Sequence, residues 1–128
     1  MDLAVYLAYA PWIPLDEQLR LGRQADQLGF HSAWVAETWG QDATAVLAAL
    51  AATTEQIRLG AAIMQSPARQ PTTTASAIST IDQLSGGRAM LGLGLSGPQV
   101  SEGWYGVPFV SPLGRTREYI EIVRMALA

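Results

Sequence analysis

Four short apolar runs, each followed by a segment with helical spacing, restrict most strongly the folds that this sequence can adopt. The runs cover residues 3–9, 30–36, 57–64 and 88–93. They are continuous rather than alternating, which is typical of strands that are buried on both faces. We therefore expect parallel strands joined by right-handed helical crossovers, which is the organisation of an α/β protein.

The segments between these runs carry recognisable helix signals. Asp42 is placed to cap the second helix, and Pro71 occupies the first position of the third. The expected helices cover residues 15–28, 43–54, 71–84 and 116–128. One stripe of the first helix is expected to hold Leu15, Leu19, Gly22, Ala25 and Leu28.

Two architectures fit such a series of βα units. One is a complete, doubly wound open sheet, and the other is part of a (β/α)8 barrel, whose full form needs about 250 residues. The chain has 128 residues, and its last expected helix stays apolar up to Leu127 without a stop signal. We therefore expect residues 1–128 to be the N-terminal part of one TIM-barrel domain, about its first four units, and hence a fragment. The open sheet remains the alternative.

Composition excludes several other classes of protein. Hydrophobic residues make up 49% of the chain and charged residues 15%, as in compact globular proteins. The chain has no cysteine, and its single histidine is His31, so no metal site is expected. The eight basic residues are dispersed and the net charge is −3, which argues against nucleic-acid binding.

The N-terminus and the apolar runs also bear on location. The longest nearly apolar run, residues 43–52, is too short to span a membrane. The first residues lack the basic stretch of a signal peptide, and Asp2 stands where such a peptide carries positive charge. We therefore expect a cytoplasmic protein that does not interact with membranes.

Residues 92–97 contain the pattern G-x-G-x-x-G, which is typical of dinucleotide-binding loops. Here Pro98 follows the last glycine, and the acid found about 20 residues later falls inside an expected helix, so the Rossmann interpretation is excluded. Gly94, Ser96 and Gly97 could still turn backbone N–H groups around a phosphate. The alternative is that these glycines only form a tight turn.

Three small residues, Gly60, Ala61 and Ala62, precede Ile63 near the end of the third apolar run. In a barrel, active sites gather at the carboxyl ends of the strands, so this segment could form a platform for a flat ring. The alternative is that the alanines fill a narrow layer of the barrel interior.

Polar groups follow the second apolar run. Glu37 and Thr38 offer a carboxylate and a hydroxyl at the same edge of the sheet, where Glu37 could orient a cofactor or act as an acid or base. The alternative is that Glu37 caps a helix or faces water. His31 lies at the beginning of the same run and therefore at the opposite end of the sheet, so a Ser-His-Asp triad is not expected.

Residues 84–109, LSGGRAMLGLGLSGPQVSEGWYGVPF, and 112–124, PLGRTREYIEIVR, resemble the luciferase-like monooxygenase superfamily. The resemblance is greatest to its coenzyme F420-dependent oxidoreductases, in particular to methylenetetrahydromethanopterin reductases. It extends to LGFHSAWVAET at residues 28–38 and IRLGAAIM at residues 57–64. It implies a TIM-type barrel and hydride transfer between F420 and a small organic substrate.

The resemblance also implies roles for individual residues. It implies a cis peptide bond between Ala62 and Ile63 in a bulge, with the deazaflavin ring against Ala61, Ala62 and Ile63. The loop from Gly94 to Pro98, with Ser96 and Gly97, would meet the phosphate-bearing tail of the cofactor.

Glu37 matches an acidic position at the end of the second strand in relatives. Some relatives that act on sugar phosphates have a catalytic histidine at the next position, where this chain has Thr38. This difference argues against a histidine base and against sugar-phosphate substrates. The catalytic residues that the resemblance implies are therefore Glu37 and Thr38.

Two other functional interpretations remain. One is an FMN-dependent luciferase-like monooxygenase, which shares the barrel. The other is a non-catalytic half-barrel. Because four strands of a closed barrel leave two edges unpaired, we expect such a chain to form homo-oligomers.

Overall fold

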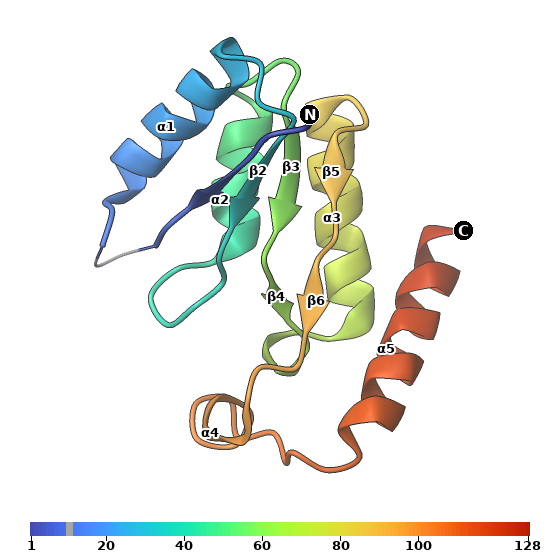
Figure 1. The fold of residues 1–128 in the computed structure, drawn as a ribbon. Helices are drawn as coiled ribbons and strands as arrows, with labels where there is room; N and C mark the ends of the chain where they lie inside the picture. The colour runs from blue at the N-terminus through green and yellow to red at the C-terminus, as the bar shows by residue number, and fades with distance from the viewer. Residues whose placement is uncertain (10–11) are drawn as a thin grey trace.

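The computed structural model describes residues 1–9 and 12–128 and shows alternating strands and helices (Figure 1). The elements are β1 (Ala4–Leu7), α1 (Leu15–Gln27), β2 (Ser32–Val35), α2 (Ala43–Ala51), β3 (Arg58–Ala61), β4 (Met64–Gln65), η1 (Ser66–Ala68), α3 (Pro71–Ser85), β5 (Ala89–Met90), β6 (Leu93–Gly94), α4 (Pro98–Ser101) and α5 (Pro112–Leu127). No helix among the described residues is long and apolar enough to cross a membrane.

The strands form a parallel sheet in the order β1-β2-β3-β5, and β4 pairs with β6 in parallel beyond it. The spatial order therefore follows the chain order without reversal. A doubly wound sheet reverses its strand order at a switch point, whereas a (β/α)8 barrel does not. The doubly wound alternative is wrong, and the sheet has the order of a partial barrel.

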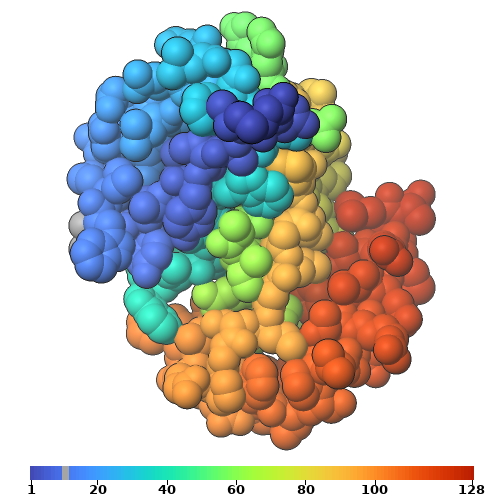
Figure 2. Space-filling view, in the orientation of Figure 1, coloured from blue at the N-terminus to red at the C-terminus, as the bar shows by residue number. Residues whose placement is uncertain are grey.

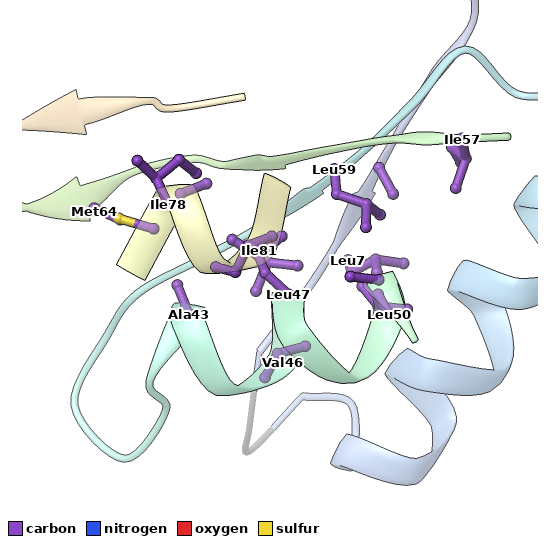
Figure 3. Close-up of a cluster of buried hydrophobic side chains, with 14 of the residues drawn as sticks. Leu7, Ala43, Val46, Leu47, Leu50, Ile57, Leu59, Met64, Ile78 and Ile81 are labelled. Atoms are coloured by element: carbon purple, nitrogen blue, oxygen red, sulfur yellow. The ribbon is translucent and has the colours of Figure 1, made fainter. Parts of the chain in front are cut away.

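The hydrophobic core lies between the sheet and helices α2 and α3 (Figure 3). Alternate residues of the strands face these helices, as the pleat of a strand requires. The largest fully buried hydrophobic side chains are Leu7, Val35, Leu47, Leu50, Ile57, Leu59, Met64 and Ile81. This packing fixes the strand ends from which the functional loops start.

The opposite face of the sheet is the one that lines the interior of a barrel. By register, Tyr6, Trp34, Gly60 and Met90 form one row across the strands. Gly60 is required here, because a Cβ atom at this position would lie 2.5 Å from the Trp34 ring. Tyr6 is 54% exposed. The green segment around residues 60–65 is visible in the middle of this face, between β1 and the C-terminal segments (Figure 2).

Several element boundaries differ from the expected ones. The third run is divided into β3 and β4 by the cis peptide bond between Ala62 and Ile63, as the resemblance implies. The fourth run is divided into β5 and β6. The last helix begins at Pro112 rather than at Thr116, and Pro98 begins the short helix α4 within the expected loop, because proline is favoured in a first helical turn.

The buried face of α1 also differs from the expected stripe. Leu15 is 49% and Leu28 67% exposed, whereas Gln18, Gly22 and Ala25 are buried. A Cβ atom at Gly22 would meet Leu50 at 2.4 Å, so the glycine allows α1 to approach α2 closely. The Gln18 amide donates to the backbone oxygen of Ile13 at 3.0 Å and to the side-chain oxygen of Gln41 at 2.9 Å, which reduces the cost of burying it.

Arg88 ties the ends of α2 and α3 together just before β5. Its Nε donates to the Ser85 carbonyl at 2.6 Å. Its two other nitrogens donate to the carbonyl oxygens of Ala51, Thr54 and Ile57 at 3.2, 2.9 and 2.7 Å. Because helix C-termini leave carbonyl groups unpaired, the planar guanidinium supplies donors that both helices need.

Asp26, near the end of α1, holds the loop before β3. Its two carboxylate oxygens accept from the backbone N–H groups of Glu55, Gln56 and Ile57 at 2.7, 2.9 and 2.7 Å. Burial alone would raise the pKa of Asp26, but these hydrogen bonds and the Arg88 charge outweigh it and lower the pKa below its ordinary value of 3.8.

We predict that Arg88→Lys lowers the free energy of unfolding by about 2–4 kcal/mol, because a single ammonium cannot serve carbonyls of two helices. Urea unfolding followed by circular dichroism measures the loss. Arg58→Lys is the matched control, since Arg58 is exposed, and its loss should stay within about 0.5 kcal/mol. Equal losses in the two variants would contradict the role of Arg88.

Asp26→Asn should lower the free energy of unfolding at pH 7 by about 1–2 kcal/mol, since the amide has one acceptor oxygen instead of two. A depressed carboxyl pKa stabilises the fold above the unfolded value of 3.8 and loses this effect as the pH falls through the folded value. The difference between wild type and variant should therefore shrink below about pH 4. Asp2→Asn, at an exposed position, serves as the control. A difference that is constant with pH would show that Asp26 does not act through its charge.

Candidate functional site

The carboxyl ends of the parallel strands meet at the lower edge of the sheet in Figure 1. The loop from β2 to α2, the segment from the end of β3 to α3, and helix α4 gather at this edge (Figure 1). Parallel α/β folds place their functional groups at this edge because the loops there converge. His31 is exposed just before β2, at the opposite end of the sheet, as expected.

Glu37 lies two residues beyond the end of β2 and is only 5% exposed. One carboxylate oxygen accepts from the backbone N–H of Gln65 at 2.8 Å, and the other accepts from Nη2 of Arg69. The Glu37 carbonyl oxygen also accepts from the side-chain amide of Gln65 at 2.8 Å. Glu37 therefore neither caps a helix nor faces water, and both of these alternatives are wrong.

Arg69 connects Glu37 to the start of α2. The same Nη2 atom lies 3.2 Å from Oδ2 of Asp42, whose Oδ1 accepts from the N–H groups of Thr44 and Ala45 at 2.8 and 3.1 Å. Burial would raise the pKa of Asp42, but the helix N–H groups and Arg69 outweigh it and lower the pKa. Burial would likewise lower the pKa of Arg69, but its two carboxylate partners raise it. Asp42 is thus ionised and Arg69 protonated at neutral pH.

Helix α5 holds the backbone of Arg69. The Tyr119 hydroxyl donates to the Arg69 carbonyl oxygen at 3.1 Å and shares a hydrogen bond of 2.6 Å with the Thr74 hydroxyl. Thr74 is fully buried, and burial raises the pKa of Tyr119. These contacts fix Arg69 from its backbone as well as from its guanidinium. Gln65, Arg69 and Tyr119 were not singled out from the sequence, because no local pattern marks their distant partners.

An open cleft of about 290 Å³ lies beside this network. Glu37, Thr38, Asp42, Arg69 and Tyr105 are among the residues that line it. Its walls come from the loop after β2, the segment before α3 and the loop after α4. The cleft brings Glu37 and Thr38, the two predicted catalytic residues, together with Arg69 and Tyr105, which are about 30 and 70 positions away in the sequence.

Two exposed indole rings meet at the same edge of the sheet. Trp39 and Trp104 are 54% and 59% exposed, and their ring centroids lie 6.0 Å apart at an interplanar angle of 65°. Edge-to-face contact of this kind is favourable between aromatic rings. It joins the loop after β2 to the loop after α4.

The segment from Ala61 to Ile63 runs alongside the end of β2, and β5 and β6 pack closely against it. A Cβ atom at Gly92 would lie 2.0 Å from the Ala61 carbonyl oxygen, and one at Gly94 would lie 2.1 Å from Cδ1 of Ile63. Neither glycine has a positive φ angle. The first glycine of the G-x-G-x-x-G pattern is therefore required by close packing against a backbone carbonyl, whereas Gly94 lies against the end of the Ile63 side chain.

The rest of the predicted phosphate loop follows β6. Ser96 adopts a left-handed conformation with φ 58°, and Gly97 and Pro98 begin α4. Ala62 and Ile63 are partly exposed, and Ala61 is buried. The structure thus brings Ile63 next to Gly94, while Glu37 contacts Gln65, two residues beyond Ile63.

This edge of the sheet has polar atoms that a bound cofactor could engage. Thr38 Oγ1, Gln65 Oε1 and Arg69 Nε are buried and have no hydrogen-bond partner within the described residues. Each unpartnered buried polar atom costs about 1–3 kcal/mol, so polar atoms of a bound molecule would be favourable here. With the partly apolar platform at Ala62 and Ile63, these residues fit a flat ring that has a polar edge. Within residues 1–9 and 12–128, no cluster of three or more His, Cys, Asp or Glu side chains could hold a metal ion.

Arg69→Met should lower the free energy of unfolding by about 3–5 kcal/mol, because it leaves the buried Glu37 carboxylate without its partner. Adding Glu37→Gln to this variant should recover most of the loss, since the buried charge is then removed as well. Urea unfolding of the single and double variants measures the coupling, with exposed Arg124→Met as the control. Simple addition of the two losses would show that the two side chains are not coupled.

Comparison with known proteins identifies the family. A family profile described as luciferase-like monooxygenase matches residues 2–128. The chain is 48% identical over 128 residues to a protein of Mycobacterium tuberculosis whose provisional name is coenzyme F420-dependent oxidoreductase, covering 100% of this chain and 37% of that protein. It is 34% identical over 121 residues to 5,10-methylenetetrahydromethanopterin reductase of Methanolobus tindarius, covering 91% of this chain and 37% of the reductase.

The fold agrees with these relatives. The crystal structure of a monooxygenase from Streptomyces bottropensis superposes with a TM-score of 0.85 at 25% identity, covering 97% of this chain and 42% of that one. The chain therefore has the α/β fold of the luciferase-like TIM barrels and covers part of the barrel. It spans 37% of the length of each of the two relatives above. By its sequence and its fold, the chain belongs to the luciferase-like monooxygenase family.

Proposed function

We propose that this chain provides the cofactor face of an oxidoreductase that transfers a hydride between coenzyme F420 and a small organic substrate. The observation that carries the proposal is the 48% identity, over the whole chain, to the protein with the provisional name of an F420-dependent oxidoreductase. The open cleft beside Glu37 and the platform at Ala62 and Ile63 support it.

In this proposal two segments hold the cofactor. Ala61, Ala62 and Ile63 lie behind the ring, and the loop after β6 lies along the phosphate-bearing tail. The loop residues concerned are Gly94, Ser96, Gly97 and Pro98. When bound, the deazaflavin supplies the hydride chemistry, and the chain contributes binding, orientation and exclusion of water.

Glu37 acts in this proposal as a positioning residue. Both of its carboxylate oxygens are occupied, by Gln65 and by Arg69, so it fixes the segment after the ring platform rather than exchanging a proton. Thr38 follows it with a hydroxyl that no described residue engages, and this hydroxyl orients the reacting edge. The indoles of Trp39 and Trp104 keep water from the substrate side.

An FMN-dependent monooxygenase is the second candidate. The family description and the similarity to the Streptomyces bottropensis monooxygenase favour a monooxygenase. It would use the same platform for the flavin ring, so the two candidates differ in the cofactor bound and not in the residues that bind it.

Fluorescence titration of the purified chain with F420 and, separately, with FMN tests the proposal. We expect saturable binding of F420 and none of FMN. Binding of FMN alone would favour the monooxygenase. If a folded chain bound neither cofactor, it would not itself form an oxidoreductase site, and the non-catalytic alternative would be favoured.

The ring platform can be tested with a substitution that adds bulk. Ala62→Leu should weaken F420 binding by at least about tenfold, because the added carbons occupy the space of the ring. Ala45→Leu adds the same bulk at an exposed position of α2 and should leave binding unchanged. Equal affinities in the two variants would place the ring elsewhere. Circular dichroism checks that both variants are folded.

A further inference from the structure

We propose that the hydroxyl of Tyr105 is the proton donor to the substrate in the cleft beside Glu37. This inference rests on the proposed function and adds a catalytic residue to it. Hydride transfer to a carbonyl or imine carbon needs a proton at the neighbouring oxygen or nitrogen, so the site requires an acid in addition to the cofactor.

The fold presents Tyr105 to the cleft from a well-held turn. The Tyr105 backbone N–H donates to the Val100 carbonyl oxygen at 3.1 Å. The next residues are fixed to the end of α4, because the Val107 N–H donates to the Ser101 carbonyl at 2.8 Å and the Ser101 hydroxyl donates to the Val107 carbonyl at 2.7 Å. Ser101 is buried. Tyr105 thus lines the cleft from a loop that is anchored on both sides.

The other titratable side chains that line the cleft are already engaged. Glu37 accepts hydrogen bonds on both carboxylate oxygens. Asp42 caps α2 through one oxygen and meets Arg69 through the other. Arg69 is paired with both carboxylates and stays protonated. Among residues 1–9 and 12–128, only burial and nearby charges act on the Tyr105 hydroxyl, and no hydrogen bond engages it. Of the ionisable groups that line the cleft, it alone is therefore available to a substrate.

The surroundings of Tyr105 raise the pKa of its hydroxyl and so keep it protonated. Burial raises the pKa of Tyr105, the negative charges of Glu37 and Asp42 raise it further, and the Arg69 charge partly opposes them. The phenol is therefore neutral at physiological pH. An alkoxide that forms next to it is a much stronger base than a phenolate, so proton transfer to the alkoxide is favourable.

The proposed step is balanced. When bound, the reduced deazaflavin would supply a hydride, that is two electrons and one hydrogen, for a new C–H bond at the carbonyl carbon. The π electron pair moves onto the carbonyl oxygen, the O–H bond of Tyr105 breaks, and a new O–H bond forms on the substrate. The Tyr105 phenolate then regains a proton from solvent. The carbonyl is reduced to an alcohol, and the deazaflavin is oxidised.

Tyr105→Phe tests the inference, with benzaldehyde as the carbonyl probe and reduced F420 as the reductant. We expect F420 to form about 100-fold more slowly in the variant, with F420 affinity within about twofold of wild type. Tyr6→Phe, on the sheet face, is the matched control and should keep the wild-type rate. A rate within about threefold of wild type for Tyr105→Phe would overturn the inference.

A spectroscopic titration provides a readout that does not depend on turnover. The tyrosinate absorbance of wild type minus that of Tyr105→Phe gives the pKa of Tyr105, which should lie above the ordinary value of 10.0. Glu37→Gln should lower it, because a negative charge is removed. Asp42→Asn, which keeps a good helix cap, replaces this variant if Glu37→Gln does not fold.

The two experiments separate failure of the inference from failure of the proposed function. Absence of F420 binding by the wild type would reject the proposed function. If the wild type bound F420 without reducing benzaldehyde, the titration would decide. If the pKa of Tyr105 were ordinary and unchanged by Glu37→Gln and Asp42→Asn, the Tyr105 hydroxyl would not lie in the cleft with these carboxylates, and the inference would be wrong. A raised pKa that falls when either charge is removed would support it.

Discussion

The buried ion pair between Glu37 and Arg69 is the interaction on which the functional edge of the sheet depends. A carboxylate this far from water must be matched by charge and hydrogen bonds, and it receives both, from Arg69 and from the Gln65 backbone. The pair joins the end of β2 to β4 and to the segment before α3. Through Asp42 it also reaches the first turn of α2. Three loops that are distant in sequence are thereby held in one arrangement.

Close packing at two glycines is the second constraint. Gly92 leaves no space for a Cβ atom beside the Ala61 carbonyl oxygen, and Gly94 packs against the Ile63 side chain. This contact explains the glycine spacing that resembles a dinucleotide fingerprint. A phosphate loop and a close strand contact both require residues without a side chain. The glycines of such a pattern therefore mark a position where another group approaches the backbone closely. Only the surrounding structure shows whether that group is a phosphate or a neighbouring strand.

The features that could be predicted from the sequence are those that depend on near neighbours. The apolar runs, the Asp42 cap and the helix start at Pro71 all follow from local patterns, and together they indicated parallel βα units. The roles of Gln65 and Arg69 depend on Glu37, which is 28 and 32 positions away, so no spacing rule reveals them. The exposed Leu28 was misplaced because helical periodicity does not show where the neighbouring helix ends.

Hydrogen bonding distinguishes the side chains that hold the site together from those that are free to react with a substrate. Gln65 and Arg69 both hydrogen-bond to Glu37, so substitution of any of the three should first lower the stability of the fold. Thr38 and Tyr105 have hydroxyl groups that no described residue engages, and they are carried on loops whose backbones are anchored. A rigid network that supports a few unengaged groups is what precise positioning of a substrate requires. The acid in this cleft that looks most catalytic from the sequence is therefore suited to hold the site together, and the reacting proton is better supplied by the less conspicuous phenol.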